Sequence, residues 1–242
     1  MQKLFLLFIF LSLLGVVSGY AQRPVIAEDF KNAKIKSITE KHYDWDEKAK
    51  LFKPSKQIPI FWRWHYDKNG FIEKEEQYDI NGKGNIDAYQ EYERDYSGRV
   101  LRIKWYDIID GKPEYSQYSI VEYQGDTAAV FQSYDSKTKE KTGITKTPLD
   151  SKNEQDLKRC RIVYFSGGNK IAKIQYQIDG TEKTVFYRYN QNGTVEETEN
   201  HFGQSNRKIC KYLYGWLKTE EIVHNIDGKI TAKYVYEIEY YK

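Results

Sequence analysis

The chain has 242 residues, a formal net charge of +3, and an aromatic content that rests on 22 tyrosines and 5 tryptophans. Its 38 basic and 35 acidic residues are interspersed, without a stretch of one sign. A nucleic-acid partner requires a concentrated basic surface, so we expect no such partner.

The N-terminus has the parts of a secretory signal peptide. A basic start precedes an apolar run over residues 4–17, and the small residues Gly19 and Ala21 suit cleavage after Ala21. The run is short for a membrane span, and no later segment is apolar enough to cross a membrane. We therefore expect residues 1–21 to be a signal peptide, residues 22–33 to be a polar leader, and the protein to be exported, whether periplasmic, on the cell surface or secreted.

A pair of hairpin turns over residues 61–82 is the clearest local pattern. An alternating aromatic strand ends at Tyr66-Asp67, after which Asn69-Gly70 closes one turn and Asn81-Gly82 closes the next. Asn-Gly accepts positive φ and closes tight hairpins, while aromatic residues favour a pleated, half-buried sheet. Strand alternation places Trp62, Trp64 and Tyr66 on one face.

Similar strand pairs run from residues 35–44 to residues 230–241. Residues 46–57 and 136–158 interrupt the rhythm and are polar and Lys-rich, so the first is predicted to be a long loop and the second an insertion loop. Residues 34–242 are therefore predicted to be one all-β domain, an antiparallel β-hairpin repeat meander of about twelve strands that forms a twisted or curled sheet. Its predicted turn glycines are Gly70, Gly82, Gly98, Gly193 and Gly228.

Residues 66–70, 78–82 and 189–193 share a Tyr-Asp/Asn-x-x-Gly pattern. They resemble YD (RHS-type) hairpin repeats of secreted bacterial proteins, whose core is Tyr-Asp-x-x-Gly. The resemblance extends over most of residues 35–242, but only the turns match well, and residues 123–125 and 214–215 depart from the pattern. The resemblance implies stacked β-hairpins and no catalytic residue.

No motif for catalysis or for binding a metal or cofactor is present, so we expect no catalytic residue, no metal and no cofactor. The acidic residues alternate with lysines, which is typical of a solvated strand face. The four histidines form two pairs whose spacing of 23 residues is close to the repeat length and is not a ligand spacing. These histidines are His42, His65, His201 and His224.

Cys160 and Cys210 invite a disulfide bond in an exported protein. Their predicted strands are about four steps apart, which is ~19 Å in a flat meander and well beyond the ~7 Å limit between bonded Cα atoms. We therefore expect two buried thiols. A strongly coiled or closed sheet would allow the alternative, a bond between them.

The aromatic residues Trp62, Trp64, Tyr66 and Trp105 could form a binding platform for sugar rings or a peptide. The alternative is that they pack the sheet, because cross-strand aromatic pairs stabilise thin sheets. The sequence favours a non-enzymatic β-repeat protein that binds an unknown protein or glycan through a sheet face. Two alternatives remain: a glycan-active hydrolase whose carboxylates converge in three dimensions, and a scaffold that assembles through a sheet edge.

Overall fold

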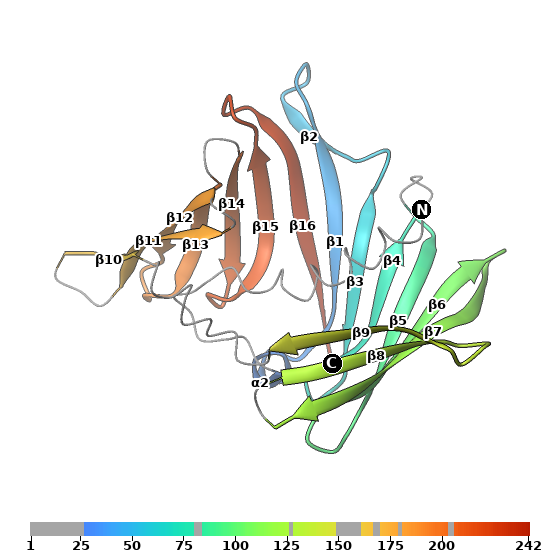
Figure 1. Cartoon of the computed structure of the whole chain (residues 1–242). Helices are drawn as coiled ribbons and strands as arrows, with labels where there is room; N and C mark the ends of the chain where they lie inside the picture. The colour runs from blue at the N-terminus through green and yellow to red at the C-terminus, as the bar shows by residue number, and fades with distance from the viewer. Residues whose placement is uncertain are drawn as a thin grey trace.

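The computed structural model describes residues 27–79, 84–125, 128–148, 161–166, 170–178, 181–202 and 206–242. They form one 16-stranded antiparallel sheet, with the short helix α2 (Ala27–Asn32) before it (Figure 1). The predicted all-β antiparallel meander is confirmed, with more strands than the predicted twelve. The strands are β1 (Ile35–Asp46), β2 (Leu51–Pro54), β3 (Ile60–Tyr66), β4 (Ile72–Tyr78), β5 (Ile86–Arg94), β6 (Val100–Ile109), β7 (Lys112–Gln124), β8 (Ala128–Asp135), β9 (Lys141–Pro148), β10 (Arg161–Tyr164), β11 (Ile171–Ile178), β12 (Thr181–Tyr189), β13 (Val195–Phe202), β14 (Asn206–Leu213), β15 (Leu217–His224) and β16 (Ile230–Tyr240).

The first strand lies in the middle of the sheet. β1 pairs with β16 along one side and with β2 and β3 along the other, so the first and last strands are neighbours (Figure 1). From β3 the strands follow in chain order to β9 at one edge, and from β16 they run backwards to β10 at the other edge. Among the described strands, neighbours in sequence are far apart in the sheet only where the chain passes from β9 to β10.

The sheet is open and strongly twisted, and β9 runs in a very different direction from β1 (Figure 1). The chain length between the two edges also excludes a flat plate. The covalent path from Pro148 to Arg161 reaches at most ~47 Å at ~3.6 Å per residue. Fourteen strand steps of ~4.8 Å would hold the edges of a flat sheet ~67 Å apart.

Three segments predicted to lack strands or helix contain them. β2 lies in the predicted loop 46–57, β9 lies in the predicted insertion loop 136–158, and α2 lies in the predicted polar leader. Among the described strands, β9 pairs with β8 alone, and its Ile144 is 63% exposed. This strand therefore needs no apolar face and shows no apolar alternation. Residues 149–158 of the predicted insertion loop lie outside the described part of the chain.

The Tyr-Asp-x-x-Gly pattern forms a three-residue hairpin loop. The Gly70 N–H donates to the Asp67 carbonyl at 3.0 Å, and the Asp67 N–H donates to the Phe71 carbonyl at 2.8 Å. The Asp67 side chain accepts hydrogen bonds from the N–H groups of Asn69 at 2.8 Å and Phe71 at 3.0 Å. The aspartate therefore caps the loop, which explains why the pattern requires Asp or Asn at this position.

The same loop recurs at Asp95, Asn190 and Asn225, where the side-chain oxygen accepts from the N–H four residues on. It is not the two-residue Asn-Gly turn that the sequence suggests, because only the glycine of Asn69-Gly70 has a positive φ. The predicted turn glycine Gly82 lies outside the described residues. The φ angles of the other four are 84° at Gly70, 86° at Gly98, 81° at Gly193 and 73° at Gly228.

Gly70 and Gly228 differ in what surrounds them, which predicts different costs of substitution. Both have positive φ, so Val at either position costs about 1–2 kcal/mol of backbone strain. A Cβ atom at Gly70 would also lie 1.8 Å from the Ala27 carbonyl oxygen, whereas a Cβ atom at Gly228 meets nothing within 4 Å. We expect urea unfolding to show a loss for Gly70→Val about 1–2 kcal/mol larger than for Gly228→Val, because α2 must move. Equal losses would contradict the packing of this turn against α2.

In the part of the chain that the structure describes, three apolar clusters of buried residues stabilise the sheet. One joins Ile35, Ile38, Tyr66 and Leu217, and Phe30 of α2 stacks on Tyr66 with ring centroids 4.4 Å apart. The tyrosine of the Tyr-Asp pattern thus packs into the core while the aspartate caps the turn. The second cluster contains Ile174, Val185, Tyr187 and Val195, and the third contains Ile103, Val121 and Ala129.

Candidate functional site

The two faces of the sheet are defined by strand register. Directly opposite residues of antiparallel neighbours share a face, as do residues two apart in a strand. We call the face that carries Ile38 and Cys210 the inner face, because the buried cluster residue Ile38 lies there. The opposite face, which carries Tyr89 and Tyr106, is the outer face.

The four residues of the predicted aromatic platform do not form one patch. Trp62 and Trp64 stack on the inner face with centroids 6.4 Å apart, and Tyr66 is only 6% exposed in the first apolar cluster. Trp64 packs against that cluster, whereas Trp105 packs against the third one. Tyr66, Trp64 and Trp105 therefore contribute to the core in two separate places.

A polar pair separates the two tryptophan positions. Trp64 is opposite Glu75 in register, Glu75 is opposite Gln90, and Gln90 is opposite Trp105. The Gln90 amide donates to the buried Glu75 carboxyl group, and burial raises the pKa of Glu75. The inner face thus alternates between apolar clusters and buried polar groups.

The outer face of β5 to β8 carries a continuous row of tyrosine rings, which we call the tyrosine ladder. The rings are stacked at each step except between Tyr106 and Tyr115, where they are tilted by 37°. Successive ring centroids are 4.6, 5.4, 6.3 and 5.2 Å apart. All of its members are half-buried. The ladder consists of Tyr89, Tyr106, Tyr115, Tyr118 and Tyr134.

A β-bulge makes the ladder continuous. Tyr115 and Tyr118 are three residues apart and would face opposite sides of a regular strand. The register of β7 against β6 shifts beside Tyr106, with Ser116 as the extra residue, and this brings both tyrosines to the outer face. The Ser116 hydroxyl donates to the Trp105 carbonyl at 3.3 Å and holds the bulge. A prediction based on strict strand alternation would place Tyr115 and Tyr118 on opposite faces, so it would miss the ladder.

Each tyrosine ring of the ladder packs against the next ring in the row. Lys74 Nζ adds a cation 4.0 Å from the Tyr89 centroid, and Arg102 and Lys139 lie 5.7 and 5.6 Å from the centroid of Tyr118. Stacked rings leave their edges and hydroxyl groups for a ligand. Burial is the main cause of the raised pKa values along the ladder, at Tyr89, Tyr106 and Tyr115.

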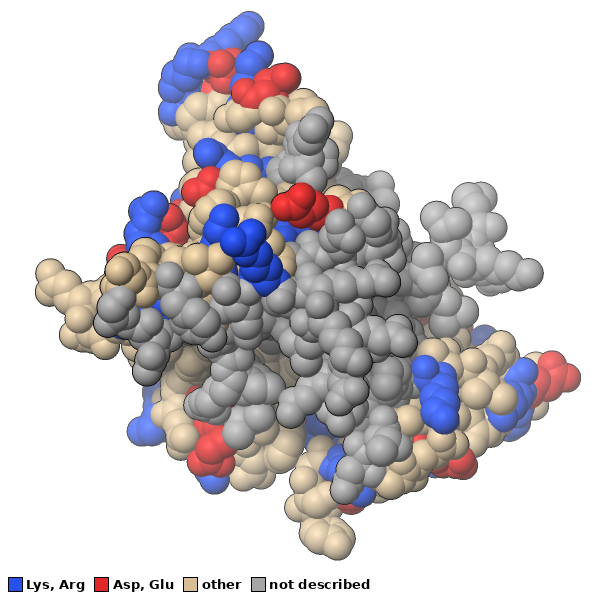
Figure 2. Space-filling view, turned by 60° about the vertical axis from the view of Figure 1, so that its left-hand side comes forward, with Lys and Arg blue, Asp and Glu red and all other residues tan. Residues whose placement is uncertain are grey.

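The charges around the ladder are paired. Lys104 and Arg102 both contact Glu93, and Lys74 lies 3.0 Å from Glu76. Figure 2 shows the same mixing on the face in view, where basic and acidic groups are interspersed. The ladder therefore offers a surface of hydroxyl groups and ion pairs, without a field of one sign.

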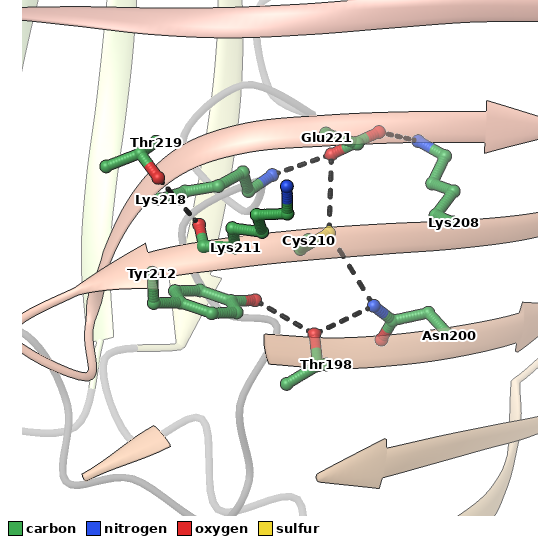
Figure 3. A network of polar contacts seen from close by, with 9 residues as sticks. All are labelled: Thr198, Asn200, Lys208, Cys210, Lys211, Tyr212, Lys218, Thr219 and Glu221. Atoms are coloured by element: carbon green, nitrogen blue, oxygen red, sulfur yellow. Dashed lines mark hydrogen bonds and ion pairs between the residues drawn. The ribbon is translucent and has the colours of Figure 1, made fainter. Parts of the chain in front are cut away.

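The inner face carries a buried polar network on β13, β14 and β15 (Figure 3). The Glu221 carboxylate lies 2.7 Å from Lys208 Nζ and 2.8 Å from Lys218 Nζ, and it accepts a weak hydrogen bond from Cys210 Sγ at 3.8 Å. Asn200 links Cys210 to Thr198. These residues connect three strands across the face.

A second bulge assembles this network. Thr219 is the extra residue of β15 against β14, so Lys218 faces the same side as Glu221. The Thr219 hydroxyl donates to the Lys211 carbonyl at 3.3 Å, as Ser116 does in its own bulge (Figure 3). The sequence spacing of Lys218 and Glu221 alone would place them on opposite faces.

Glu221 in this network and Glu40 nearby on β1 have pKa values that are shifted in opposite directions. Burial alone would raise the pKa of Glu221, but Lys218 and Lys208 outweigh it and lower the pKa to about 2. Glu40 on β1 has its pKa raised to about 7, because burial outweighs the attraction of Lys218. Burial also raises the pKa of the Cys210 thiol to about 11, so the thiol is protonated at neutral pH. Cys210 is free, and Cys160 lies outside the described residues.

The histidines are not brought together in pairs. His42 stacks on Tyr234 on the inner face with centroids 4.7 Å apart, while His65 contacts Glu76 at 3.1 Å on the outer face. His201 contacts Glu199 at 2.9 Å. Within the described ranges, no group of three or more potential ligands could hold a metal ion.

The two edge strands differ in length and composition. β9 contains Lys141 and Lys146 and ends in a proline, features that discourage pairing with another strand. β10 has 4 residues. Within the described residues, neither edge strand is long, flat and apolar enough to favour assembly.

Known proteins resemble the chain only distantly. No family model matches, and no curated protein matches. Among solved structures, the TcdB2-TccC3-Cdc42 complex has 11% identity and a TM-score of 0.32, and the match covers 85% of this chain and 13% of that one. A porin-like protein from Bacteroides uniformis has 11% identity and a TM-score of 0.26, with 85% and 96% covered. A Bacteroides fragilis protein of unknown function has 9% identity and a TM-score of 0.19, with 63% and 88% covered.

The resemblance to YD repeats stays loose, because the turns repeat the pattern while no family model matches the chain. The chain spans about an eighth of the length of the TcdB2-TccC3-Cdc42 chain that it matches. None of the helices in the described residues has the length and apolar character that a membrane span requires.

Proposed function

We propose that this is an exported, non-enzymatic β-repeat protein that binds a protein or a glycan through a sheet face, and that the tyrosine ladder is its binding surface. The observation that supports the proposal is the unbroken row of half-buried tyrosines across four strands, in which each ring contacts the next. Tyrosine supplies a large contact area with a polar tip and is enriched at binding interfaces.

The ladder is pre-ordered for binding. Each ring is held by its neighbours in the row, so a ligand need not fix loose side chains, and the entropy lost on binding is small. The inner-face aromatic residues are different, because Trp64 and Trp105 pack against core clusters. The chemistry on offer is ring edges and hydroxyl groups, which suits a polysaccharide or an extended peptide with many polar groups.

The proposal is tested by affinity electrophoresis through gels that contain mannan, β-glucan or solubilised peptidoglycan, and by binding to an array of extended peptides. The ladder variant Tyr106→Phe/Tyr118→Phe keeps the rings and removes two hydroxyl groups. Tyr96→Phe is the control, because Tyr96 lies in a turn and is fully exposed at 106%. We expect at least one probe to bind the wild type and the control, and to bind the ladder variant less. Equal binding by all three proteins, or no binding to any probe, would contradict the proposal.

A second candidate function, a glycan-active hydrolase, is favoured by one specific observation. Glu40 and Glu221 have pKa values of about 7 and about 2, and the charge of Glu221 contributes to the raised pKa of Glu40 on the inner face. Two carboxyl groups whose pKa values are pushed apart suit the acid and base roles of glycoside hydrolysis. The test is whether the wild type hydrolyses a polysaccharide of the same panel. If it does, and if Glu40→Gln abolishes that hydrolysis, the hydrolase replaces the binding protein as the proposed function.

A further inference from the structure

The tyrosine ladder also has the geometry for a covalent modification. Tyr89 on β5 and Tyr106 on β6 are directly opposite in register, and their rings are stacked with centroids 4.6 Å apart and planes 15° apart. This is the shortest centroid distance in the ladder. Coupling of two tyrosines requires ring carbons next to the hydroxyl groups to meet, and closely opposed parallel rings need little movement to do so.

A proton acceptor lies beside one of the two rings. The Tyr106 hydroxyl group is hydrogen-bonded to the Glu91 carboxylate, which shares the outer face of β5 and β6. A tyrosine that loses an electron must also lose its phenolic proton, and a hydrogen-bonded carboxylate can receive it. The pair therefore combines ring contact with a route for the proton.

We propose that Tyr89 and Tyr106 are a site of oxidative cross-linking, at which a one-electron oxidant joins the two rings into a dityrosine that bridges β5 and β6. A haem peroxidase with hydrogen peroxide is an oxidant of this class. Each tyrosine loses one electron and its phenolic proton, and the two phenoxyl radicals form one carbon–carbon bond between their ortho positions. The two ring hydrogens at the new bond then move to the oxygens, and one hydrogen peroxide is reduced to two water molecules.

The cross-link would join positions that the sheet already holds together. Because the register of β5 and β6 is fixed by their backbone ladder, the bond would close the intervening hairpin without displacing either strand. A covalent bridge reduces the freedom of the unfolded chain, as a disulfide bond does. This inference concerns the same surface as the proposed function, but it does not depend on any ligand.

The test treats the purified full chain with peroxidase and hydrogen peroxide at low protein concentration, and maps the products by dityrosine fluorescence and peptide mass spectrometry. We expect a monomeric product two hydrogen atoms lighter, with the bond between Tyr89 and Tyr106, and with a higher melting temperature. Tyr106→Phe keeps the ring and should lose this product. Tyr96→Phe should keep it, and Glu91→Gln should slow its formation.

Oxidation at the fully exposed Tyr96 is the outcome that would oppose the proposal. If exposure alone directs the oxidation, the main product is a dimer linked through Tyr96, and the proposal is wrong. A main bond between Tyr118 and Tyr134, or no dityrosine in a reaction that cross-links free tyrosine, also overturns it. A far-ultraviolet circular dichroism spectrum like that of the wild type shows that Tyr106→Phe is folded.

Discussion

Glu40→Gln should abolish a loss of stability that the wild-type protein shows as the pH rises. The pKa of Glu40 is raised from 4.5 to about 7, first by burial and then by the nearby charge of Glu221, against the opposing effects of Lys218, Tyr236 and Lys208. The folded state thus binds more protons than the unfolded state between these pH values, so the free energy of unfolding falls as the pH rises through this window. The expected fall is about 3 kcal/mol, at 1.36 kcal/mol per pKa unit.

Glutamine cannot ionise, so the variant should lack this contribution. Denaturant unfolding should be measured at pH 4.5 and above pH 7. The free energy of unfolding of the variant, relative to that of the wild type, should be about 3 kcal/mol higher above pH 7 than at pH 4.5. Glu221 contributes in the opposite sense and at lower pH, because its pKa is lowered to about 2 and its stabilisation is lost only as the pH falls towards that value. Glu237→Gln removes an exposed carboxylate that contacts Lys41 and serves as the charge control. Parallel curves for wild type and Glu40→Gln would contradict the burial of this group.

Tyr66→Ala should cause the largest loss of stability among single substitutions at the Tyr-Asp turns. Tyr66 is 6% exposed, belongs to the first apolar cluster and stacks on Phe30 of α2 at 4.4 Å. Removal of a buried aromatic side chain costs about 3–5 kcal/mol, because apolar contacts are lost and a cavity remains.

Tyr96→Ala is the matched control, because this tyrosine is also in a hairpin turn but is fully exposed. Its cost should be within about 0.5 kcal/mol. Thermal and urea unfolding of both variants measure the difference. Similar, small losses for the two would show that the core does not extend through the Tyr-Asp turn to α2.

The local parts of this fold could be predicted from the sequence. The hairpin turn at Asp67 and Gly70 depends on hydrogen bonds within five residues, so its pattern is visible in the chain. The edge strand β9 could not be predicted, because a strand with one neighbour needs no apolar face. The pairing of β1 with β16 also has no local signal, since it joins the two ends of the domain.

The candidate sites also could not be predicted from the sequence, because each depends on a β-bulge. The ladder needs the bulge at Ser116, and the polar network needs the bulge at Thr219. One extra residue reverses the face of every side chain beyond it, so alternation read from the sequence misplaces them. Hydroxyl residues that bond to the opposite carbonyl are the only local trace of these bulges, and such residues are too common to be diagnostic.

Tyrosine nitration in the presence and absence of a bound ligand tests the central claim most directly. The ligand is the polysaccharide or peptide from the panel that binds the wild type, and the extent of nitration at each tyrosine is read by mass spectrometry. We predict that the ligand protects Tyr106, Tyr115 and Tyr118, while Tyr96, which is 106% exposed, reacts equally in both samples. Unchanged nitration along the ladder, with the ligand bound, would contradict the assignment of the outer face as the binding surface.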